Sequence, residues 1–230
     1  MKKIVVLTGA GMSAESGLST FRGSDGLWAN YHIEDVATPN AWRKNPALVL
    51  DFYNQLRKQL FDVEPNPGHI ALADLEKHFD VQIITQNVDN LHERAGSTNV
   101  LHLHGELMKM RSTGSGEEVI DVLPDKIEFF IGDLCPKGFQ LRPHIVWFGE
   151  AVPKIENAIK IVEKADILVV IGTSLKVYPA AGLIHNVKQG TPIYLIDPNE
   201  IDSLPSNIVV IKKGGNDGLQ ELREKYLKLK

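Results

Sequence analysis

The chain has 230 residues, of which 43% are hydrophobic and 23% charged, a composition typical of a globular protein with one sizeable core, or a core and a small appended module. The net charge of −4 argues against a nucleic-acid-binding protein, and the single cysteine excludes an internal disulfide and fits a reducing compartment. The apolar run 4–7 is too short for a signal peptide, and no run is long enough to span a membrane, so we expect a cytoplasmic protein with neither nucleic-acid nor membrane partners.

Short apolar runs recur along the chain and predict strands at residues 4–7, 81–85, 100–103, 145–148, 167–171, 193–196 and 208–211. Helix-like stretches lie between many of them, at residues 46–60, 69–77, 154–164, 180–188 and 218–227. Strands that are apolar at nearly every position are typical of a sheet covered by helices on both faces. The pattern therefore predicts an α/β protein with a Rossmann-like parallel sheet, whose functional loops lie at the carboxyl edge.

Two segments interrupt this alternation and indicate a second, smaller lobe. One is rich in proline, and the other is polar and rich in glycine. We place the small lobe at approximately 21–79 and 108–141. The large nucleotide-binding lobe then takes approximately 1–20, 80–107 and 142–230 of a single domain.

A glycine turn follows the first predicted strand. Gly9, Gly11 and Ala14 fit the form G-x-G-x-x-A, which lets backbone N–H groups approach the phosphates of a dinucleotide at a helix start. Such a turn also occurs for steric reasons alone, and Ser13 and Ser16 can equally serve as helix caps.

Polar clusters follow two other predicted strands. Gln86, Asn87 and Asp89 come after one of them, where an Asx-type turn is the plainer reading. In the other, alternation puts His102 and His104 on one face. A strand histidine is more often structural than catalytic, but Gly105 opens space beside His104, whose neutral imidazole can accept a proton at cytoplasmic pH.

Six motifs, in this order, resemble those of the sirtuin family. They are GAGMSAESG at 9–17, TFRG at 20–23, QNVD at 86–89, HGE at 104–106, LRPHIVWFGE at 141–150 and GTS at 172–174. The resemblance covers essentially the whole chain from about residue 4 and is to bacterial-type sirtuins without zinc-binding cysteines. It implies an NAD-dependent protein lysine deacylase that produces nicotinamide, O-acyl-ADP-ribose and free lysine.

The same resemblance implies roles for individual residues. His104 would take a proton from a ribose hydroxyl of the cofactor, Asn87 would orient that ribose and a water, and Asp89 would bind the nicotinamide carboxamide. Either Asp197 or Asn199 would bind the adenosine ribose. The full set implied to bind NAD is Gly9, Ala10, Gly11, Ser13, Glu15, Phe21, Arg22, Trp28, Gln86, Asn87, Asp89, His104, Gly172, Thr173, Ser174, Asp197, Asn199 and Asp217.

Acyl-lysine proteins or peptides are the partners that the resemblance implies. The end of the segment 146–150 would pair with an extended peptide through its backbone. Val88 and Phe148 would line the lysine channel. The residues implied to bind this substrate are Tyr53, Arg57, Val88, Val146, Phe148, Gly149 and Val177.

The chain departs from the family pattern at the usual four-cysteine zinc site. Ser112 and Ser115 stand at the first pair of ligand positions, and only Cys135 is left of the second pair. Because one thiolate and two serines cannot make a tight tetrahedral zinc site, we predict no structural zinc. Packing would hold the module instead, through Val119, Ile120, Val122, Leu123, Phe129, Phe130 and Ile131.

A second departure concerns the acyl group. Family members that remove succinyl or malonyl groups usually have a tyrosine followed three positions later by an arginine, and here Leu56 follows Tyr53 at that spacing. On a helix Arg57 points about a hundred degrees away from position 56. Unless Arg57 swings in, a buried acyl carboxylate lacks its partner, so we expect neutral acyl groups, acetyl first, with desuccinylation or demalonylation as the alternative.

Three rival functions are weighed against deacylation. A mono-ADP-ribosyltransferase could use the same pocket with another acceptor. A metal hydrolase could use His102 and His104 as an H-x-H ligand pair, although no further ligand cluster is evident. A non-catalytic NAD sensor is the third, and the intact set of Asn87, Asp89 and His104 argues against it.

Overall fold

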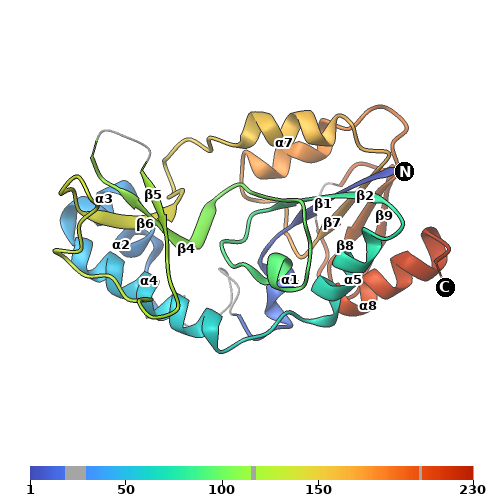
Figure 1. Cartoon of the computed structure of the whole chain (residues 1–230). Helices are drawn as coiled ribbons and strands as arrows, with labels where there is room; N and C mark the ends of the chain where they lie inside the picture. Colours follow the sequence, from blue (N-terminus) through green and yellow to red (C-terminus); the bar gives the residue numbers. More distant parts are fainter. Residues whose placement is uncertain (19–29, 115–117, 202–203, 230) are drawn as a thin grey trace.

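The computed structural model describes residues 1–18, 30–114, 118–201 and 204–229. Two lobes of unequal size lie side by side (Figure 1), the larger built on a six-stranded sheet and the smaller on a three-stranded one. Within the described part of the chain, no helix is long and apolar enough to cross a membrane. Phe21, Arg22, Trp28 and Ser115 lie outside the described residues.

The large sheet is parallel throughout and follows the order β3-β2-β1-β7-β8-β9. Its strands are β1 (Lys3–Thr8), β2 (Asp80–Thr85), β3 (Val100–His102), β7 (Ile167–Ile171), β8 (Ile193–Ile196) and β9 (Ile208–Ile211). This is the Rossmann order, so the predicted α/β class is confirmed. The strand order reverses between β1 and β7, and ligands of such sheets bind in the crevice at that point.

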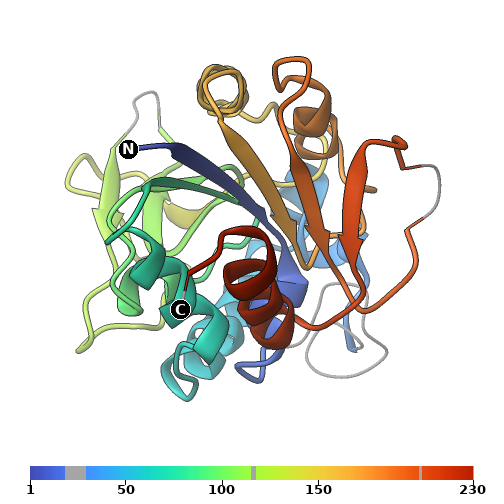
Figure 2. The same cartoon turned by 90° about the vertical axis from the view of Figure 1, so that its right-hand side faces the viewer.

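Helices cover both faces of this sheet (Figure 2). This explains why the strands have apolar side chains pointing to both faces. Val5 and Leu7 of β1 pack toward α7 (Ile155–Val162) and the 3-10 helix η2 (Ala180–His185). Ile4 and Val6 pack toward α5 (Pro67–Leu75) and α8 (Gly215–Glu221). A π-helical turn, η3 (Leu222–Tyr226), continues α8.

The small lobe combines an antiparallel sheet with helices. Its sheet has the order β5-β4-β6, formed by β4 (Gly105–Ser112), β5 (Val119–Asp121) and β6 (Leu141–Ile145). The helices are α2 (Ile33–Val36), α3 (Pro39–Lys44) and α4 (Pro46–Phe61). Helix α4 begins where Asn45 accepts from Leu48 N and Pro46 takes the first turn, a favoured helix start. Two short helices, α1 (Ala10–Ala14) and α6 (Leu91–Arg94), follow β1 and β2 in the large lobe.

Three sequence-based boundaries need correction. The run 145–148 does not add a strand to the parallel sheet, because β6 ends at Ile145 and pairs with β4. The small lobe does not extend to residue 79, because Leu72 and Leu75 of α5 pack against β1 in the large-lobe core. Residues 105–107 and 142–145, expected in the large lobe, belong to the small sheet.

The polar module between β4 and β6 is fastened to α4 by buried hydrogen bonds as well as by packing. Arg57 is fully buried and donates to Asn54 Oδ1 (2.7 Å) and Leu107 O (3.0 Å). Asn54 in turn donates to Phe129 O (2.9 Å) and accepts from Phe129 N (3.0 Å). Val122 and Phe129 are buried as expected, with Ile120 packed against their cluster. Val119, Leu123, Phe130 and Ile131 are instead exposed.

Replacing Arg57 by leucine is expected to destabilise the protein by roughly 2–3 kcal/mol, because the buried oxygen of Leu107 would lose its donor. Urea unfolding measures this change. The neighbouring Lys58, whose side chain is 53% exposed, provides the matched control, since Lys58→Leu should change stability by no more than about 0.5 kcal/mol. Equal unfolding midpoints for the two variants would contradict the structural role of Arg57.

Candidate active site

A cavity of about 630 Å³ is lined by residues of both lobes. Its large-lobe wall is made by the segments that follow β1, β2 and β7, at the carboxyl edge of the parallel sheet. Its small-lobe wall comes from α4, β4 and the segment after β6. The location agrees with the crevice expected for a doubly wound sheet.

Bare backbone forms the part of the cavity next to β1 and β7. Gly11 N donates to Gly172 O (2.9 Å), and a Cβ on Gly9 would lie 2.7 Å from Thr173 Cβ. Gly172 has a φ of +62°, and a Cβ there would lie 2.3 Å from Met12 N. Side chains other than hydrogen are therefore excluded, and the two turns present a surface on which a phosphate group can lie close to the main chain.

Asn87 is held in one orientation beside this junction. Its side-chain Nδ2 donates to Gly9 O and to Ser13 Oγ, both at 3.1 Å. Its backbone N donates to Thr85 Oγ1 (3.0 Å). Because both protons of the amide nitrogen are used, the amide oxygen is the side-chain atom that Asn87 can offer to a ligand.

Asp89 lies on the same loop and is only 7% exposed. It accepts from Ser13 Oγ (2.9 Å) and from Leu91 N (3.2 Å). Burial raises the pKa of Asp89, while these two hydrogen bonds act in the opposite direction. Asp89 and Asn87 share Ser13 as a partner, so the three side chains form one polar group facing the cavity.

His104 brings an imidazole to the cavity from the short segment between β3 and β4. Its Nδ1 lies 3.1 Å from Gln86 O, and since a carbonyl can only accept, Nδ1 carries the hydrogen and Nε2 is the basic nitrogen. Burial lowers the pKa of His104 from its ordinary value of 6.5. The ring is therefore neutral at pH 7 and can act as a general base at Nε2.

A second polar group lies at the end of β8. Asp197 Oδ1 accepts from Asn199 N (2.9 Å) and from Asn199 Nδ2 (3.2 Å). Both residues line the cavity, and Asp197 is 7% exposed. Asp197 therefore fixes Asn199, and the two polar side chains can serve a ligand together.

The small-lobe end of the cavity is mostly apolar. Tyr53 Oη accepts from Trp147 Nε1 (3.1 Å), and burial raises the pKa of the Tyr53 phenol. Leu56, Val88 and Leu107 line the cavity beside them. This end suits an uncharged aliphatic group rather than an ion.

The cavity brings together most of the residues singled out from the sequence: Gly9, Ala10, Gly11, Ser13, Tyr53, Gln86, Asn87, Val88, Asp89, His104, Val146, Phe148, Gly149, Gly172, Thr173, Ser174, Val177, Asp197 and Asn199. Among the described residues, three of those predicted for the site lie elsewhere. The Arg57 side chain points into the polar module, where burial lowers its pKa to about 10. Glu15 accepts from Asn216 N (3.1 Å) at the start of α8, the helix that also carries Asp217.

Several lining residues were not predicted from the sequence as site residues. Trp147 and Glu150 belong to a motif that was recognised, yet only their neighbours were assigned. Glu150 accepts from Trp147 N (2.9 Å) and from Arg142 Nη1 (2.8 Å), so it fixes the turn after β6. Leu107 continues the strand alternation from Gly105, a signal that could have found it. Tyr178 gives no such signal.

The chemistry of the donor set does not favour a metal centre. Both ring nitrogens of His102 are hydrogen-bonded, Nδ1 to Asn87 O (3.1 Å) and Nε2 to Glu93 Oε1 (2.8 Å), so an H-x-H ligand pair is not available. Within the described residues, no group of three or more metal-binding side chains is present. In the polar module, Ser112 Oγ lies 3.3 Å from Cys135 Sγ. The absence of structural zinc stays a prediction.

Comparison with known proteins identifies relatives of this chain. The model of the Sir2 family matches residues 9–179. A protein of Bacteroides thetaiotaomicron named NAD-dependent protein deacylase is 57% identical over 228 residues, covering 97% of both chains. One from Helicobacter pylori strain 26695 with the same name is 52% identical over 230 residues, covering 100% of this chain and 99% of its own.

Solved structures agree with these relatives. The complex of a Sir2 homologue with NAD has a TM-score of 0.88 at 42% identity and covers 99% of this chain and 90% of its own. The complex of a mutant Sir2 homologue with ADP-ribose has a TM-score of 0.88 at 43% identity and covers 100% and 94%. With the family model matching well over half of the chain and the fold shared throughout, the protein belongs to the Sir2 family, the sirtuins.

Proposed function

We propose that this protein removes acetyl and other uncharged acyl groups from lysine side chains of cytoplasmic proteins and consumes NAD in doing so. The coarser activity, NAD-dependent protein deacylation, follows from its membership of the Sir2 family and from relatives more than 50% identical that carry that name. The observation that carries the proposal is His104, a neutral imidazole whose Nδ1 is fixed and whose Nε2 is basic, at a cavity with a backbone-walled end and an apolar end.

The cavity fits NAD. The glycine junction of Gly9, Gly11 and Gly172 would receive the pyrophosphate, since any Cβ there would meet neighbouring backbone. Asp197 and Asn199 would hold the adenosine ribose, and Asp89 would hold the nicotinamide carboxamide. Bound NAD would supply the ribose carbon that bonds to the acyl oxygen as nicotinamide leaves, and one water would complete the exchange, so that NAD, acyl-lysine and water give nicotinamide, O-acyl-ADP-ribose and free lysine. These assignments extend to Ala10, Ser13, Gln86, Thr173 and Ser174, which line the same cavity.

His104 and Asn87 would do the chemical work of the chain. His104 accepts a proton from a ribose hydroxyl at Nε2, since its Nδ1 stays bonded to Gln86 O. Asn87 offers its amide oxygen, because its nitrogen is held by Gly9 O and Ser13 Oγ. The two groups need no rearrangement before the reaction, and such preorganisation lowers the barrier.

The preference for uncharged acyl groups follows from Leu56 and Arg57. Leu56 lines the apolar end, where a cation would be needed to pair with an acyl carboxylate. Arg57 is not available for that purpose, because its guanidinium is buried against Asn54, Leu107 and Met110. Desuccinylation and demalonylation are therefore disfavoured. No observation favours ADP-ribosyl transfer to another acceptor.

Replacing His104 by alanine should lower the rate of nicotinamide release from NAD and an acetylated peptide by at least roughly 100-fold, because the general base is removed. NAD affinity, measured by calorimetry, should stay largely unchanged. His78, which is exposed just after α5 and does not line the cavity, supplies the control variant His78→Ala. Activity retained in His104→Ala would contradict the role of the base.

The decline of kcat/KM at acid pH should reflect the protonation of His104. Its imidazole must be neutral to accept a proton, and burial lowers its pKa below 6.5. We therefore expect kcat/KM to be maintained as the pH falls to 6.5 and to decline only below that value. A half-maximal point of kcat/KM for NAD above pH 6.5, measured by initial rates at subsaturating NAD with saturating acetylated peptide, would contradict this assignment.

Leu56→Arg should raise the ratio of desuccinylation to deacetylation by roughly tenfold, because the apolar end of the cavity would gain a cation for the acyl carboxylate. A panel of acetyl, succinyl and longer acyl peptides, followed by nicotinamide release, measures the ratio. Gln55 neighbours Leu56 on α4 but does not line the cavity, so Gln55→Arg is the matched control. Wild-type protein that already prefers succinyl peptides would overturn the proposed preference.

A further inference from the structure

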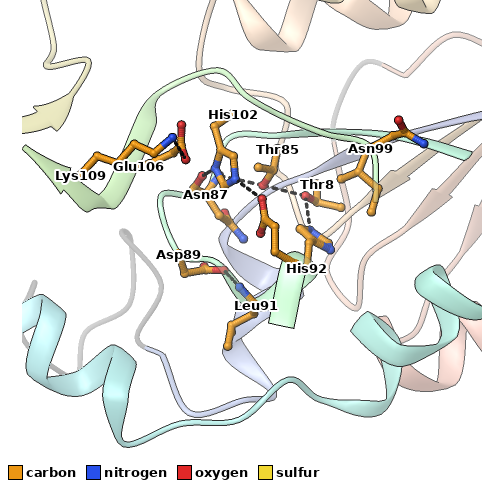
Figure 3. A network of polar contacts seen from close by, with 12 residues as sticks. Thr8, Thr85, Asn87, Asp89, Leu91, His92, Asn99, His102, Glu106 and Lys109 are labelled. Carbon is orange, nitrogen blue, oxygen red and sulfur yellow. Dashed lines mark hydrogen bonds and ion pairs between the residues drawn. The ribbon is translucent and has the colours of Figure 1, made fainter. Parts of the chain in front are cut away.

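His102, two residues before His104, lies in a network of polar contacts that includes Thr85, Asn87 and Glu106 (Figure 3). Its side chain is 4% exposed at the end of β3 and does not line the cavity. Nδ1 lies 3.1 Å from Asn87 O, and Nε2 lies 2.8 Å from Glu93 Oε1 on α6. The imidazole thus bridges the loop that carries Asn87 and the short helix that follows it.

Both partners of His102 are acceptors. A backbone carbonyl has no hydrogen to donate, and neither has an ionised carboxylate. Each ring nitrogen must then carry a hydrogen, which only the imidazolium form provides. We propose that His102 is held as an imidazolium by Glu93 and acts as a positioning residue that fixes the Asn87 peptide for catalysis, an inference that rests on the proposed deacylase function.

The charged groups around His102 favour this form. Burial by itself lowers the pKa of His102, but the hydrogen bond and charge of Glu93, the carbonyl of Asn87 and the charge of Glu106 outweigh it, so that the pKa is raised. Glu106 faces the ring from β4 and is paired with Lys109 (3.0 Å). Asp89 and His92 also interact electrostatically with His102.

The other side of the Asn87 peptide is fixed by uncharged groups. Asn87 N donates to Thr85 Oγ1, which accepts from Thr8 Oγ1 (2.8 Å). Thr8 Oγ1 lies 3.0 Å from His92 Nε2, and burial lowers the pKa of His92 well below its ordinary value. The N–H of Asn87 therefore meets a neutral chain of hydroxyls, and its C=O meets a cation. Both the N–H and the C=O of Asn87 are hydrogen-bonded, so the backbone that carries its side-chain amide is fixed in position.

Two histidines on the same strand end are thereby kept in opposite protonation states. Among the described residues, His104 has a single acceptor, Gln86 O, and burial lowers its pKa. His102 has two acceptors and a raised pKa. As the pH rises through the pKa of His102, its ring loses one of its two donors. The clamp on Asn87 then loosens, and activity should decline on the alkaline side of the profile while His104 remains competent.

Nitrogen-15 NMR of histidine-labelled protein tests the protonation state without any substrate. Both ring nitrogens of His102 should give protonated shifts at pH 7, whereas His104 should show one protonated and one basic nitrogen. His102→Asn identifies the signals and keeps an amide that can donate to Asn87 O. A His102 spectrum with one basic nitrogen at pH 7 would overturn the inference, whether or not the protein proves to be a deacylase.

The kinetic test uses Glu93→Gln, with Glu163→Gln on the exposed end of α7 as the matched control. Loss of the carboxylate should move the alkaline limb of kcat to lower pH by about one unit. It should also lower kcat at pH 8 more than it changes KM for NAD. The Glu163→Gln profile should match wild type.

Two variants of His102 complete the test. His102→Asn should retain part of the activity and lose the alkaline limb, because an amide donates but does not titrate, while His102→Leu should lower kcat roughly tenfold or more, as removal of an orienting partner typically does. A wild-type enzyme that is inactive on every acyl peptide would refute the proposed function instead. Active wild type with an alkaline limb unmoved by Glu93→Gln would refute the positioning role of His102.

Discussion

The approach of two backbones at the point where the sheet reverses is the constraint on which the rest of the site depends. Gly9 and Gly11 after β1 meet Gly172 after β7, with Gly11 N bonded to Gly172 O at 2.9 Å. Any side chain on these residues would push the two turns apart, and the parallel pairing of β1 with β7 would have to yield. Because the glycines permit this contact, the cavity wall consists of main chain, and Asn87 can reach Gly9 O to be oriented. The backbone-walled part of the cavity and the orientation of Asn87 therefore share one structural origin.

The burial of polar side chains has two different effects in this protein. Around the cavity it sets protonation states, since it lowers the pKa of His104 and raises that of Asp89. In the small lobe it builds structure, since the buried guanidinium of Arg57 on α4 donates to Leu107 O on β4. A buried cation surrounded by acceptors is strongly held in place. Because the Arg57 side chain is bonded to Leu107 O and Ile127 O and does not line the cavity, Leu56 rather than a cation lines the apolar end.

The sequence allowed the large lobe to be predicted well and the small lobe poorly, for physical reasons. The central strands of the parallel sheet are covered on both faces, so their apolar runs are continuous and visible, as at Ile167–Ile171. Strand β4 mixes lysine and arginine with methionine because one side of it meets solvent, and it was not recognised. Arg57 looked like a charged helix residue near a substrate, since its acceptors at Leu107 and Ile127 are distant in sequence. Its spacing from Asn54 was the one local signal.

The same limit explains why the protonation states of His102 and His104 could not be predicted from the chain alone. Alternation places both on one face of a strand, and their residue type is identical. What separates them is the number of acceptors around each ring, and these come from elsewhere: Gln86 for one, Asn87 and Glu93 for the other. When both ring nitrogens face acceptors and one of these is a carboxylate, a neutral ring would leave one acceptor without a hydrogen. When a carbonyl accepts from one nitrogen only, the other nitrogen stays unprotonated and basic. The division of labour between the two histidines is therefore a property of the packing of α6 against the strand ends, not of the motif itself.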